Sequence, residues 1–129
     1  MRLLTNHLFI FMRNFKELKI WQKGFQIAIN IYKITKAFPA DERFALVSQI
    51  NRAAVSISSN IAEGSSRSSG KEYNHYIQIS LGSCFELETQ LLIAKELNYG
   101  NQAMISEVLA QLTEEEKMLT AFGNTLKNS

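Results

Sequence analysis

Apolar residues recur at intervals of three and four along most of the chain, which is the spacing of one face of a helix. Short segments rich in Pro, Gly, Ser and Asn interrupt this pattern, and Pro39 disfavours helical geometry in the residue before it. Four helical segments of similar length joined by short loops predict an all-α fold, an antiparallel up-down-up-down four-helix bundle. The predicted helices cover residues 15–38, 44–64, 71–97 and 105–126.

Several residues predict where these helices begin and end. Asp41 is an N-cap candidate for the second helix, and Gly64 is a C′ glycine that would end it. Ser69 and Glu72 have the spacing of a capping box at the start of the third helix. In the fourth segment only Glu115 breaks the apolar register, so we expect one continuous helix there.

The first and third segments carry more apolar surface than a single core needs. The two interleaved apolar series of residues 15–38 together cover roughly 200° of the helix circumference, whereas one core-facing stripe needs roughly 100°. The third segment is apolar on nearly every side, and its small residues Gly82 and Ser83 are expected to allow close approach of another helix. This excess predicts a second buried surface, and therefore assembly of several copies.

The composition fits a single-domain protein that resides in a reducing compartment. The chain has 129 residues, is 46% hydrophobic and has one cysteine, Cys84, so it can form a core but no internal disulfide. No apolar run reaches the ~18 residues of a membrane span. We expect a cytoplasmic protein that does not enter the membrane, with a flexible N-terminal extension at 1–14 and the four-helix bundle domain at 15–129.

Catalytic chemistry has little support in the sequence. Glu72 and His75 form the E-x-x-H spacing that di-iron bundles use, but such a site needs a second copy, and the only other histidine is His7. Cys84 lies among apolar positions and is interpreted as a small core residue rather than a nucleophile. Nucleotide-binding and hydrolase motifs are absent. We expect no catalytic residue, no metal and no cofactor.

The second segment carries a polar line that is nearly free of charge, where an ordinary surface helix would have Lys and Glu. Short polar residues there indicate that something packs against them. Antiparallel helices would place residues whose numbers sum to roughly 135 at the same level, so Arg52 is level with Ser83 and one turn from Glu86. We expect a buried, charge-assisted contact between Arg52 and Glu86, because an unpaired carboxylate among apolar neighbours is costly. The predicted polar network or interface comprises Arg52, Ser56, Asn60, Glu63, Ser83 and Glu86.

The net charge of +2 conceals a basic N-terminal third and an acidic C-terminal segment. Basic side chains on one surface can follow phosphates, and an assembly of subunits would multiply a modest patch. No nucleic-acid reading motif is present, so solvated helix faces remain the alternative. The candidate nucleic-acid-binding residues are Lys19, Lys23, Lys33, Arg67 and Lys71.

Two stretches carry a family resemblance: Q-I-N-R-A-A-V-S-I-S-S-N-I-A-E-G at 49–64 and G-S-C-F-E-L-E-T-Q-L-L-I-A at 82–94. With F-P-A-D-E-R-F and W-Q-K-G before them, they resemble the S23-like four-helix-bundle proteins encoded within intervening sequences of bacterial 23S rRNA genes. The resemblance covers about residues 15–126. The positions that match the family pattern are Arg52, Ser56, Asn60, Glu63, Gly64, Gly82, Ser83 and Glu86.

The resemblance implies a bundle that assembles as a ring-like homopentamer and has no established enzymatic activity. The family is also similar to the accessory protein of diversity-generating retroelements, whose basic pentameric barrel is associated with nucleic acid and reverse transcriptase. The leading hypothesis is therefore a non-enzymatic homo-oligomer that binds RNA or DNA through a basic surface. The alternative is a purely structural oligomer that interacts only with protein. An enzyme is a distant third, and would need a bound metal or a ligand pocket around Arg52 and Glu86.

Overall fold

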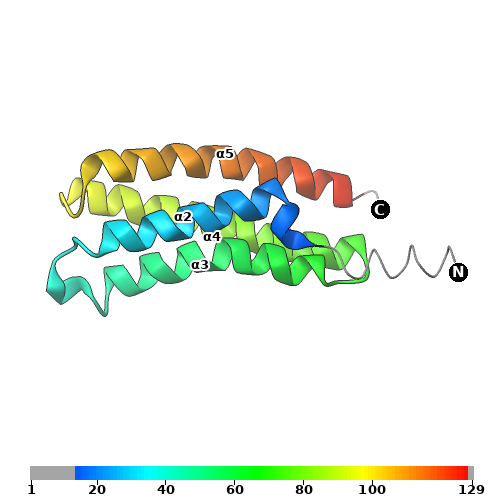
Figure 1. Ribbon diagram of the computed structural model, residues 1–129, viewed down its shortest axis with the longest axis horizontal. Coiled ribbons are helices and arrows are strands. Elements are labelled where there is room, and N and C mark those ends of the chain that lie inside the picture. The colour runs from blue at the N-terminus through cyan, green and yellow to red at the C-terminus, as the bar shows by residue number, and fades with distance from the viewer. Residues whose placement is uncertain (1–13, 128–129) are drawn as a thin grey trace, which may run out of the picture.

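Four helices follow one another along the chain and pack in sequence order, with the last also contacting the first (Figure 1). The structure is a computed structural model that describes residues 14–127. It confirms the predicted all-α, up-down arrangement. Of the extension expected at 1–14, only Asn14 lies within the described residues. The helices are α2 (Lys19–Thr35), α3 (Leu46–Ser65), α4 (Gly70–Glu96) and α5 (Gln102–Leu126), with short 3-10 helices η1 (Phe15–Glu17) and η2 (Ala40–Glu42).

The core selects one of the two apolar series of α2. Ile27 and Ile31 are fully buried and Ile34 nearly so, whereas Phe25 and Tyr32 of the other series are about half exposed. The same division occurs on α4, where one apolar arc packs inward and the others face outward. The core is therefore built mainly from aliphatic residues at helical spacing, and a second apolar surface remains outside it.

The predicted helix ends are partly correct. The Ser69 hydroxyl accepts a hydrogen bond from the Glu72 backbone N–H at 3.1 Å, which confirms the N-cap of α4. The prediction for Asp41 is wrong, because it lies in η2 and α3 begins only after Ala45, which makes no side-chain cap. The fourth helix runs unbroken through Glu115, as expected.

Two glycines have roles other than those predicted. Gly64 does not terminate α3 as a C′ residue, because the helix continues to Ser65. It instead allows a close approach to α4, since an added Cβ would lie 2.9 Å from Cβ of Tyr76. Gly82 faces open space, with nothing within 4 Å of an added Cβ, so it does not provide close packing within this chain.

Candidate functional site

A hydrogen-bonded polar seam joins α3 to α4. The Asn60 amide donates to the Ser56 hydroxyl at 2.8 Å, and the Ser56 and Ser83 hydroxyl oxygens are 2.8 Å apart. Ser83 also donates to the backbone carbonyl of Ile79 at 3.1 Å. The donor between the two serines can be assigned. Because the Ser83 hydroxyl donates its single proton to the Ile79 carbonyl, the Ser56 hydroxyl donates to Ser83. The seam fixes the register of the two helices through directional contacts that apolar packing alone would not supply.

The predicted buried contact between Arg52 and Glu86 is wrong. Both side chains are exposed, and no ion pair joins them among the described residues. They instead line opposite sides of a groove of about 280 Å³ between α3 and α4. The prediction failed because Glu86 lies between Ile79 and Ile93, and these isoleucines are themselves exposed in the single chain. The carboxylate therefore keeps its water and needs no internal partner.

Glu63 belongs to a different contact, at the turn from α3 to α4. Its carboxylate pairs with Arg67 one turn later. The Arg67 guanidinium also donates to the Tyr76 hydroxyl at 2.9 Å and lies 4.7 Å from the centre of the same ring. Together the two interactions fasten the loop onto α4, so both charged residues have a structural use.

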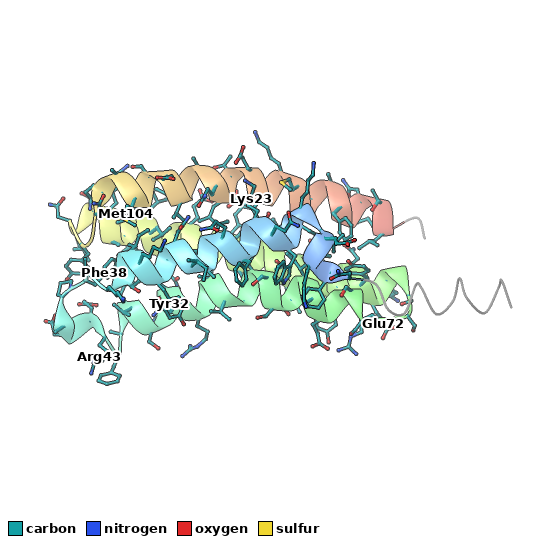
Figure 2. The ribbon with its side chains drawn as sticks, viewed as in Figure 1. Lys23, Tyr32, Phe38, Arg43, Glu72 and Met104 are labelled. Carbon is teal, nitrogen blue, oxygen red and sulfur yellow. The ribbon has the colours of Figure 1, made fainter. Side chains whose placement is uncertain are left out.

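The candidate nucleic-acid-binding residues do not form one continuous patch. Lys23 points towards α5 and pairs with Glu114 at 2.9 Å (Figure 2). Lys19 and Lys33 are exposed on α2, separated by roughly 20 Å of helix, given 1.5 Å per residue. Lys71 is exposed at the start of α4. Of the five residues, only these three have no ion pair among residues 14–127.

Two apolar rows lie on the outer surface. The outer α2 row consists of the exposed Phe25 and Ile29 and the partly buried Trp21, and the Trp21 and Phe25 rings stack with centres 5.0 Å apart. The outer α4 row consists of Ile79, Phe85, Leu92, Ile93 and Leu97. Contiguous exposed apolar residues of this kind mark interaction surfaces. Their helices do not contact each other within the described chain, so the two rows belong to separate faces of the bundle.

Comparison with known proteins places the chain in a family. Residues 16–121 match the model of the 23S rRNA-intervening sequence protein family. The chain belongs to this family. It is also similar to a crystal structure from Bacteroides thetaiotaomicron, described as a protein of unknown function from the S23 ribosomal protein family, with a TM-score of 0.73 and 24% identity over 81% of this chain and 97% of that one. No curated protein sequence matches significantly.

In this family member the residues considered as possible metal ligands or nucleophiles do not converge on one site. Glu72 and His75 are both exposed at the start of α4. No group of three metal-ligating side chains occurs within the described ranges. No helix among them is both long and apolar enough to cross a membrane. Cys84 is fully buried, and burial, together with the Glu115 charge, raises the pKa of its thiol, so the thiol stays protonated as a core residue.

Sequence reasoning overlooked a buried carboxyl group in the core of this family member. Glu115 is 0% exposed, and neither of its oxygens has a hydrogen-bond partner among the described residues. Burial raises its pKa to about 8, although the charge of Lys23 acts in the opposite direction. Gly24 leaves the space for it, since an added Cβ there would lie 3.2 Å from Oε2 of Glu115. The signal in the sequence was the single interruption of an otherwise apolar register.

Proposed function

We propose that this protein is a non-enzymatic homo-oligomer of the cytoplasm, held together by the outer α2 row of one copy against the outer α4 row of the next. The observation that carries the proposal is the presence of two large apolar rows on helices that do not touch in one chain. Phe25 is 47% exposed and Phe85 is 52% exposed. Covering such side chains is favourable by about 25 cal/mol per Å² of apolar surface.

The position of the rows favours a ring. When two different surfaces of one subunit pair head to tail, the assembly closes into a ring if the rotation between subunits permits it. A symmetric dimer would use the same row on both partners and leave the other row exposed. The proposed number of five subunits comes from the family resemblance stated above.

Separate variants of the two rows test this assembly. The double substitutions F25S/I29S and L92S/I93S should each shift the native oligomer towards the 14.7 kDa chain in light scattering. Mixing the two variants should restore a 1:1 heterodimer, because each retains the row that the other has lost. A121S, on the exposed face of α5, is the control and should assemble normally. A native monomer would contradict the proposal, and so would normal assembly of either double variant.

Nucleic-acid binding is the second proposed function, favoured by Lys19, Lys33 and Lys71, which are exposed and unpaired among residues 14–127. The resemblance to the retroelement accessory protein supports it by analogy. Contacts to phosphate release counterions, so binding of a structured RNA should weaken at least about tenfold between about 50 and 200 mM salt. Fluorescence anisotropy measures this directly.

A matched pair of triple variants locates the contacts. K19Q/K33Q/K71Q should weaken binding and reduce its salt dependence, whereas K95Q/K117Q/K127Q removes the same charge from exposed positions on α4, on α5 and at the end of α5, and should have less effect. Equal effects of the two variants would contradict a role for the three lysines. No binding at low salt would leave the alternative, an oligomer with a purely structural role.

A further inference from the structure

A groove of about 580 Å³ runs between the end of α2 and the start of α3. Its volume is within the range of sites that hold small ligands or single nucleotides. Figure 2 shows Tyr32 on α2 and Arg43 at the corner that leads into α3. The residues that determine its chemistry are Tyr32, Lys36, Arg43, Phe44, Asn51 and Arg52.

The groove is cationic and lacks an internal counter-charge. Lys36, Arg43 and Arg52 line it without any carboxylate in the lining, and none of the three forms an ion pair among the described residues. The neighbouring Glu42 is turned away, because its carboxylate accepts a hydrogen bond from the Tyr99 hydroxyl at 3.5 Å. Three unbalanced positive charges along one groove attract an anion with several negative groups.

Two exposed rings accompany these charges. Phe44 is 89% exposed, the most exposed large apolar side chain described, and the guanidinium of Arg43 lies 5.7 Å from the centre of its ring. Tyr32 is about half exposed on the facing helix. Exposed rings next to cations fit a ligand that alternates flat apolar groups with negative charges, since bases stack on aromatic rings while phosphates pair with Lys and Arg.

We propose that this groove binds single-stranded nucleic acid, with a base against Phe44 and backbone phosphates on Lys36, Arg43 and Arg52. The inference rests on the proposed nucleic-acid function and specifies its strand form and its site. None of these residues is among the five basic residues that the sequence analysis proposed for nucleic-acid binding. Asn51 adds a neutral donor, because its carbonyl oxygen already accepts from the Thr35 hydroxyl at 3.0 Å while its amide N–H groups have no partner described.

Two exposed apolar side chains, one inside the groove and one outside it, provide the test and its control. F44L removes the ring from the groove and should weaken binding of a labelled single-stranded 12-mer at least about fivefold, with the salt dependence unchanged. V55A trims an exposed apolar side chain of α3 that does not line the groove, and should bind as the native protein does. R43Q should weaken binding and also lower the salt slope by about 0.7. A duplex of the same sequence should bind more weakly than the single strand, and inorganic polyphosphate should compete less well than an unlabelled strand.

The outcomes separate the groove from the general proposal. If the native protein binds nucleic acid but F44L and R43Q bind as tightly, the groove assignment is wrong and the proposed function stands. If no nucleic acid binds at low salt, the groove assignment and the proposed nucleic-acid-binding function are both wrong. Light scattering on each variant detects a third result: a change of oligomeric state with unchanged binding would show that another copy covers the groove, which also overturns the assignment.

Discussion

Replacing Glu115 with Gln is expected to abolish most of the loss of stability that the native protein shows between pH 5 and 8. The pKa of Glu115 is raised to about 8 in the folded state by burial, whereas an unfolded chain has the ordinary value near 4.5. The folded protein therefore holds a proton that the unfolded chain releases. The stabilising effect of this proton is complete below pH 4.5 and disappears as the pH rises through 8.

The size of the effect follows from proton linkage. While one extra proton is bound in the folded state, the free energy of unfolding falls by up to about 1.4 kcal/mol per pH unit. Ionisation is costly because neither carboxyl oxygen has a hydrogen-bond partner among residues 14–127. Among the charged groups that face Glu115, Lys23 from α2 favours the ionised form, but its effect on the pKa is smaller than that of burial.

Urea titrations at a series of pH values and a fixed protein concentration measure this prediction. E115Q should resemble the native protein near pH 5 and become progressively more stable than it towards pH 8.5. Part of the slope should remain in both proteins, because burial and the neighbouring Glu88 raise the pKa of Glu116 to about 7. E107Q, an exposed position on the same helix, should follow the native curve. Parallel curves for E115Q and the native protein would refute the role of Glu115.

The helices could be predicted because the physical signal is local. Apolar spacing gave the four segments, and Ser69 gave the start of α4, since both depend on residues within one or two turns. Which apolar series faces the core is a different matter. The series of Ile27 and that of Phe25 are equally regular, and only packing against α3 and α5 makes the first interior and the second exterior.

The predictions of site residues depended on which apolar series of each helix faces the core, and the sequence alone does not determine this. Glu86 was assigned to a buried seam because its neighbours are isoleucines, yet those residues form part of the exposed α4 row. Ser56 and Ser83 were assigned to one polar network, and a hydrogen bond joins them, although the level rule for antiparallel helices placed Ser83 beside Arg52, about one turn before Ser56. The cationic groove was missed because Arg43 and Phe44 follow a 3-10 turn, where no helical period relates them to α2.

Gly64 and Gly82 should respond oppositely to the same substitution, although both lie within helices. An added Cβ at Gly64 would lie 2.9 Å from Cβ of Tyr76 and 3.1 Å from the backbone carbonyl of Tyr73, so α3 and α4 would have to separate. Overpacking of this kind costs about 1–3 kcal/mol. At Gly82 nothing lies within 4 Å of an added Cβ, so alanine should stabilise α4 by up to about 1 kcal/mol through its helix propensity.

Urea midpoints followed by circular dichroism compare G64A with G82A against the native protein. G64A should unfold at lower urea and G82A at slightly higher urea, with similar slopes. The contrast tests the cause, because both changes give the same gain in backbone rigidity and differ only in what the new methyl group meets. Equal stabilisation by the two substitutions would mean that the helices can part at Gly64 without cost. A loss of stability in G82A that depends on protein concentration would instead assign Gly82 to the contact between subunits, where its lack of a side chain would matter.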